Sequence, residues 1–130
     1  MTIEIGDKVT ASYKTGRYVG EIIDIKPKLD KAVVKVLAVI AHPRQGDLHA
    51  PNQVDVQLFH ERRALAHTEK ALVPLSSIKP FEDEIPDYHF SLIKAIKDQM
   101  AKLVKDDSEY AKLSYQKLEI LLKGYEKNID

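Results

Sequence analysis

The sequence predicts an α+β protein, with a small SH3-like β-barrel over residues 1–81 and a C-terminal antiparallel two-helix hairpin over residues 82–130. Short apolar runs that alternate with polar residues, separated by turns containing Gly or Pro, indicate the barrel. After the segment FEDEIPD the apolar spacing becomes that of amphipathic helices. The charge balance also changes sign there, since residues 1–81 hold 12 Lys and Arg against 9 Asp and Glu, and residues 82–130 hold 8 against 11.

Two strands and a tight turn are predicted at the start of the chain. Residues 7–14 alternate apolar and polar side chains, which is typical of a half-buried strand. Thr15 and Gly16 indicate a hairpin turn, in which we expect the glycine to supply the positive φ. Residues 17–26 form the second predicted strand, and Gly20 within it indicates a bulge or a sharp bend.

The third predicted strand, residues 31–41, is nearly continuous in apolar and β-branched side chains, so we expect it to be central in the sheet. Residues 42–53 hold two prolines and predict a loop, because proline cannot donate to a sheet ladder. Residues 54–58 alternate again and predict a strand. Residues 64–73 predict one bent strand or two short ones, and a Pro-containing turn then leads to a last strand around residues 78–79.

The first helix is predicted to begin near Pro86, which suits the first helical turn, with Glu84 and Asp87 favourable at the positive end of the helix dipole. Asp98 and Lys102 have the spacing of a favourable ion pair on one helix. We expect the helical hairpin to pack on the barrel, on its copy in a dimer, or on both. The apolar stripe of its first helix comprises Tyr88, Leu92, Ile93, Ala95, Ile96, Gln99, Met100, Leu103 and Val104.

A second helix is predicted after a short break, with Asp106 as its N-cap and Glu109 in the capping-box position. Leu113 and Ile120 lie on its flank, seven residues apart, and two interpretations of them stay open. They are either partly buried against the barrel or form a second contact surface for a partner helix, including that of a homodimer. The main apolar face comprises Ala111, Ser114, Tyr115, Leu118, Leu121, Leu122 and Tyr125.

The composition is that of a globular protein, with 44% apolar and 31% charged residues and a formal net charge of zero. The sequence holds no cysteine, which excludes disulfides, thiol catalysis and cysteine-based metal sites. The first residues lack the basic and apolar regions of a signal peptide, and no apolar run approaches the length of a membrane span. We therefore expect a cytoplasmic protein.

Histidines and arginines cluster between the third strand and residue 67. Four of the five histidines lie there, and a metal site built from His42, Asp47, His49, His60 and Glu61 has suitable ligand types. Their spacing matches no known helical ligand pair, and no nucleophile elbow, phosphate loop or paired-carboxylate pattern accompanies them. The sequence therefore predicts no metal, no cofactor, no catalytic residue and no enzyme activity.

Two binding functions remain for this region. Nucleic-acid binding would use lysines of the barrel with Arg62 and Arg63, although the barrel carries a charge of only +3 and lacks a stacking motif. Protein binding is indicated because a loop of this length in a small domain is usually functional or disordered, and because arginine is enriched at interfaces. The alternative, which stays open, is that Arg62 and Arg63 only cap a hairpin and pair with Glu61 or Asp55. The predicted partner-binding residues are His42, Arg44, Asp47, His49, His60, Glu61, Arg62, Arg63, Leu113 and Ile120.

Four segments together resemble the kinase-associated protein B family of spore-forming Bacillus-type bacteria. They are VTASYKTGRYVGEI, VLAVIAHPRQGDLH, FHERRALA and IKPFEDEIPDY, and the resemblance extends over nearly the whole chain. It implies a non-enzymatic accessory protein that activates a membrane sensor histidine kinase feeding phosphate into the sporulation phosphorelay. The family has also been called a lipoprotein. Because this sequence has no cysteine, we expect membrane recruitment through the cytoplasmic part of the kinase. The resemblance assigns no functional residues.

Overall fold

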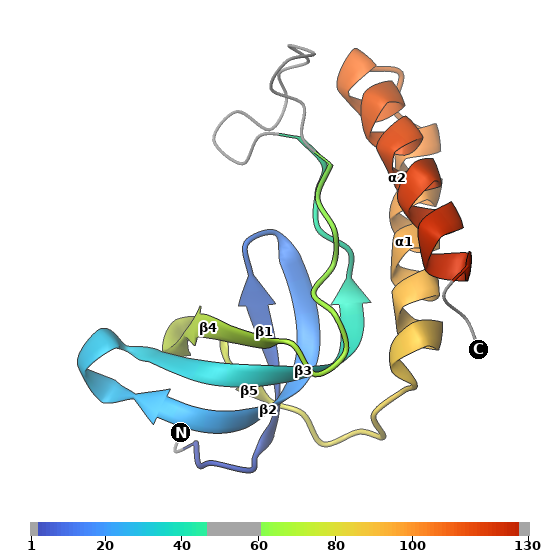
Figure 1. The fold of residues 1–130 in the computed structure, drawn as a ribbon. Helices are drawn as coiled ribbons and strands as arrows, with labels where there is room; N and C mark the ends of the chain where they lie inside the picture. The colour runs from blue at the N-terminus through green and yellow to red at the C-terminus, as the bar shows by residue number, and fades with distance from the viewer. Residues whose placement is uncertain (1–2, 47–60, 128–130) are drawn as a thin grey trace.

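A computed structural model describes residues 3–46 and 61–127 (Figure 1). Its strands form one five-stranded antiparallel sheet in the order β4-β3-β2-β1-β5, and two helices follow the sheet in the chain. The α+β class with a small barrel-like sheet and a C-terminal helix pair is confirmed, and the sheet ladder is open between its edge strands β4 and β5. The elements are β1 (Lys8–Tyr13), β2 (Gly16–Lys26), β3 (Lys31–Ala41), β4 (Lys70–Pro74), β5 (Lys79–Pro80), α1 (Tyr88–Val104) and α2 (Glu109–Lys127).

Two apolar clusters hold the fold together. One lies inside the bent sheet, where alternate residues of the strands point inward and Ile22 is fully buried. The other lies between the sheet and the helices, where Tyr18, Val36 and Val39 meet Ile96 of α1 and Leu118 of α2. The second cluster explains the position of the helices beside the end of β3 in Figure 1. The division of the chain at residues 81 and 82 stays a prediction.

The hairpin between β1 and β2 differs in detail from its prediction. The positive φ belongs to Lys14, at 54°, and Gly16 has no positive φ. Position 16 requires glycine because there is no room for a side chain. A Cβ there would lie 2.5 Å from the hydroxyl oxygen of Tyr18. At Gly20 the predicted irregularity is present. The register shifts between Val19 and Gly20, and a Cβ would lie 2.6 Å from the carbonyl oxygen of Lys35.

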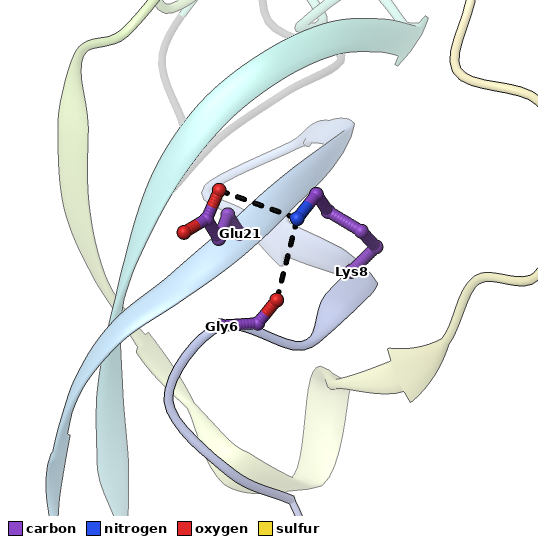
Figure 2. Close-up of polar contacts among 3 residues, drawn as sticks. All are labelled: Gly6, Lys8 and Glu21. Carbon is purple, nitrogen blue, oxygen red and sulfur yellow. Dashed lines mark hydrogen bonds and ion pairs between the residues drawn. The ribbon is translucent and has the colours of Figure 1, made fainter.

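Polar contacts tie the start of the chain to strands β1 and β2. Lys8 Nζ lies 3.3 Å from a carboxylate oxygen of Glu21, its cross-strand neighbour on β2. The same ammonium donates to the carbonyl oxygen of Gly6 at 3.3 Å, as Figure 2 shows. Such exposed pairs stabilise a fold by at most about 1 kcal/mol, so the apolar clusters dominate the stability.

The strand predicted over residues 64–68 is absent. Residues 61–66 have no regular secondary structure, and β4 begins only at Lys70 after a positive φ at Thr68. The 3-10 turn Leu75–Ser77 and the two-residue strand β5 follow, as the Pro-containing turn predicted. The strand predicted over residues 54–58 lies outside the described residues.

Both helix starts lie two or three residues later than predicted. Asp87 is the N-cap of α1 and accepts a hydrogen bond from the Phe90 amide at 2.9 Å, so Pro86 precedes the helix. Ser108 rather than Asp106 caps α2, since its hydroxyl accepts from the Ala111 amide at 3.1 Å. Asp106 accepts from the Ser108 amide at 2.9 Å and shapes the turn between the helices.

Two further predictions, both about side chains of α1, are wrong. Asp98 pairs with Lys94 at 3.0 Å, one turn before it, instead of with Lys102. Val104, placed on the buried stripe, is 67% exposed because it lies at the last helical position, beyond the apolar contacts.

Candidate functional site

The candidate site is built on residues 61–66, which we call the strap. The strap runs beside residues 42–46, the continuation of β3, on the side of the sheet that faces the helices (Figure 1). It lacks ladder hydrogen bonds, so side chains must satisfy its backbone groups.

The side chain of Gln45 satisfies backbone groups in the first half of the strap. Its side chain is 1% exposed, and its carbonyl oxygen accepts from the Arg62 amide at 2.8 Å. Its amide nitrogen donates to the carbonyl oxygen of Arg62 at 2.9 Å and to that of Pro43 at 3.0 Å. One side chain thus pairs with a residue of the strap as a neighbouring strand would.

Three tyrosines hold the second half of the strap. The Ala64 amide donates to the hydroxyl of Tyr125 at 3.1 Å, and the Leu65 amide donates to the hydroxyl of Tyr18 at 3.2 Å. The Tyr88 hydroxyl donates to the carbonyl oxygen of Leu65. These tyrosines come from α2, β2 and α1, so both helices and the sheet fix the strap.

Burial keeps these hydroxyls protonated. Desolvation is the main cause that raises the pKa of Tyr18 to about 12, and it also raises the pKa of Tyr88 and of Tyr125. The hydroxyls therefore remain neutral hydrogen-bonding groups throughout the physiological range. We predicted Tyr88 and Tyr125 only as members of apolar helix faces. Their hydrogen bonds to the strap could have been anticipated, because a buried tyrosine hydroxyl usually has a hydrogen-bond partner.

His42 is a buried part of the same arrangement, with only 4% of its surface exposed. Its Nδ1 lies 3.0 Å from the carbonyl oxygen of Pro43, which only accepts, so Nδ1 carries the proton. Its Nε2 then accepts from the hydroxyl of Tyr125 at 3.0 Å. Desolvation lowers the pKa of His42 to about 4, so the ring is neutral at pH 7.

Cations stand on the outer side of this arrangement. The Arg63 guanidinium lies 5.3 Å from the ring centroid of Tyr125, and that of Arg44 lies 5.6 Å from the ring centroid of Tyr110. Arg62 is half-buried and its Nε donates to the carbonyl oxygen of Gly46 at 2.9 Å. The arginines are therefore held against aromatic faces and backbone.

The structure brings four predicted residues together at the strap, namely His42, Glu61, Arg62 and Arg63. Three of them reach the surface, whereas His42 supports them from inside. The Arg44 guanidinium instead lies against Tyr110 of α2 and lines a separate hollow beside the turn between the helices. Asp47, His49 and His60 lie outside the described residues. On α2, Leu113 is half-buried and Ile120 is 59% exposed, and neither lines the hollows beside the strap.

The lysines on which the nucleic-acid alternative depends lie elsewhere. On the sheet, Lys35 is the cross-strand neighbour of Lys70, and Lys26 that of Lys31. Lys26 also pairs with Asp24 at 2.7 Å. These lysines belong to the body of the sheet and do not extend the arginine cluster at the strap.

Metal chemistry receives no support from the described geometry. Across residues 3–46 and 61–127, no three His, Asp or Glu side chains lie close enough together to hold a metal ion. In His42 both ring nitrogens are already engaged in hydrogen bonds.

Comparison with known proteins gives the family. The family model described as "Kinase associated protein B" matches residues 13–126 of the chain. The chain belongs to the kinase-associated protein B family. A member named "Kinase-associated lipoprotein B", from Bacillus subtilis (strain 168), is 49% identical over 124 residues, which cover 95% of each sequence.

A crystal structure from the same family has the same fold. The kinase-associated protein B from Bacillus cereus is 45% identical, with a TM-score of 0.84, over 96% of this chain and 99% of the other. In the part of this family member that the structure describes, neither helix has the length and apolar character needed to span a membrane.

The role of Gln45 is tested by Gln45→Glu. The new carboxylate oxygen would face two backbone carbonyl oxygens, so we expect a loss of about 2 kcal/mol in unfolding free energy at pH 7. The repulsion raises the pKa of this glutamate in the folded state. Stability relative to the native protein should therefore return as the pH falls below 5. Urea denaturation at pH 4.5 and pH 7 measures both effects, and an equal loss at both pH values would contradict the arrangement.

The burial of His42 predicts a pH dependence of stability. Its pKa is about 4 in the folded protein against an ordinary 6.5, so the unfolded chain binds the proton first as the pH falls. The contribution of neutral His42 to the free energy of unfolding is fully present above pH 6.5 and is lost as the pH falls to 4. The whole loss is about 3 kcal/mol. His42→Gln should flatten the urea-midpoint profile over this range. An unaltered profile in His42→Gln would refute the assignment.

Proposed function

We propose that this chain is a non-enzymatic accessory protein that binds the cytoplasmic part of a membrane sensor histidine kinase and promotes its phosphate transfer towards sporulation. The observation that carries the proposal is the family match over residues 13–126. The names of both relatives contain the words kinase-associated, which supports a kinase as the partner. The protein acts in the cytoplasm and reaches the membrane through the kinase.

The chemistry of the strap supports a role in binding rather than catalysis. A general base needs a nitrogen or oxygen within reach of a substrate proton and a suitable pKa. His42 is buried, its pKa is lowered to about 4, and both of its nitrogens have partners. The tyrosine hydroxyls are engaged with the strap backbone and their pKa values are raised.

The docking surface in this proposal is the outer side of the strap. It presents Glu61, Arg62 and Arg63, with His42 beneath them, and the proposed surface extends to Arg44, whose guanidinium lies against Tyr110 of α2. Arginine is favoured at protein interfaces because its planar group donates several hydrogen bonds in fixed directions. Asp47, His49 and His60 lie outside the described residues and remain in the proposal as predicted partner-binding residues.

The proposal assigns different tasks to the two parts of the chain. Residues 1–81 present the strap, and residues 82–130 fix it through Tyr88 and Tyr125. Leu113 and Ile120 then remain a second candidate surface, for the kinase or for a second copy of the chain. Ile120 is exposed, but scattered exposed apolar residues are common on proteins that bind nothing there.

Arg63→Gln tests the docking surface. Arg63 is exposed and loses only its contact with the ring of Tyr125, so the change should lower the melting temperature by no more than about 5 °C. Binding of the full chain to the purified cytoplasmic part of the kinase should weaken at least about tenfold, since interface arginines contribute strongly. Isothermal calorimetry measures the affinity, and phosphorylation of the kinase with and without the protein measures activation.

Arg17→Gln is the matched control, because Arg17 is also exposed but lies on β2 and does not line the hollow beside the strap. It should leave both affinity and activation unchanged. Equal affinity for native protein and Arg63→Gln would show that the kinase docks elsewhere.

A further inference from the structure

A small hollow lies between the β1–β2 turn and the strap. It has a volume of about 230 Å³, and its lining includes Tyr13 and Lys14 from the turn, Pro43 from the chain after β3, and Arg62, Arg63 and Leu65 from the strap. The segments that meet here are far apart in the sequence. Gln45 and the tyrosine hydroxyls hold the strap in place at this point.

The hollow carries an excess of positive charge. Lys14, Arg62 and Arg63 line it together with one acid, Glu61, although the whole chain has no net charge. The ion pairs of the described residues join other side chains, and none of them includes these three cations. Three cations near one concave surface repel each other and attract an anion.

The conformation of Lys14 adds an independent observation. Its φ of 54° lies in the left-handed region, which favours glycine or asparagine. Its ammonium lies 5.5 Å from the ring centroid of Tyr13, and both residues line the hollow. A lysine is thus placed where the backbone prefers glycine. Such strained residues cluster at functional sites, because function offsets the loss of stability.

The size of the hollow limits what fits. Sites for complete small molecules usually occupy about 300–1,000 Å³, and this hollow is smaller. It has room for one side chain. Pro43, Leu65 and the ring of Tyr13 provide apolar walls for the stem of that side chain, and the cations provide donors for its charged end.

We propose that this hollow binds a single anionic side chain of a partner protein, ending in a carboxylate or a phosphate group. The identity of the partner as the kinase rests on the proposed function, but the anion site itself does not. Arginine forks match both oxyanions, and the phosphate group carries the larger charge.

Small aromatic anions test the site directly. The full chain is titrated with phenyl phosphate and, separately, with phenylacetate, and backbone amide shifts are followed by NMR. We expect saturable shifts at Lys14, Arg62 and Arg63 that weaken with added salt, and the tighter compound identifies the preferred end group. Absence of saturable shifts at these residues with both compounds would overturn the proposal.

Lys14→Gly separates binding from folding. Glycine relieves the left-handed backbone, so this variant should melt at a higher temperature than the native protein. It also removes one cation, so its affinity for the better anion should fall at least about fivefold. Misfolding cannot produce both results together.

Asp30→Gly is the control variant, since Asp30 has a φ of 53° at the turn before β3 and does not line the hollow. It should raise the melting temperature and leave anion affinity unchanged. Equal affinity in native protein and Lys14→Gly would overturn the site. If Lys14→Gly weakens binding of phenyl phosphate or phenylacetate but not of the kinase, the hollow is an anion site and the kinase is not the protein that fills it.

Discussion

The backbone of the strap is the constraint on which the site depends. Buried or half-buried backbone groups need hydrogen-bond partners, and a segment outside the sheet ladder has to find them among side chains. Gln45 supplies them for Arg62, and the hydroxyls of Tyr18, Tyr88 and Tyr125 supply them for Ala64 and Leu65. The arginines of the strap therefore have fixed positions even though their segment is neither helix nor strand.

This constraint also gives the C-terminal helices a role beyond covering an apolar surface. Two of the three tyrosines belong to the helices, and Tyr125 joins the strap to His42 through one hydroxyl. A change that shifts α2 would shift the strap and the hollow beside it. The position of the strap and the packing of the helices are thus coupled through part-buried side-chain hydrogen bonds.

The sequence predicted the strands and the buried helix faces, because these depend on the spacing of apolar residues. The strands around Val9, Ile22 and Val34, and the buried helix faces around Ile96 and Leu118, follow from spacing alone. The contacts of the strap do not, because they join residues up to 61 positions apart through single polar atoms. Histidine and arginine clustering predicted a binding site in this region, which stays a prediction. Whether His42 is buried or exposed could not be predicted, because it depends on the distant Tyr125. The positive φ at Lys14 was assigned to Gly16, since propensity favours glycine there.

The central claim is that the strap and the adjacent β1–β2 turn form the surface that meets the kinase. Hydrogen–deuterium exchange of the full chain, alone and with the cytoplasmic part of the kinase, tests it most directly. The account predicts slower exchange at the amides of residues 61–66 and 14–16 in the complex. Slower exchange confined to α2 around Ile120, with residues 61–66 and 14–16 unchanged, would contradict it.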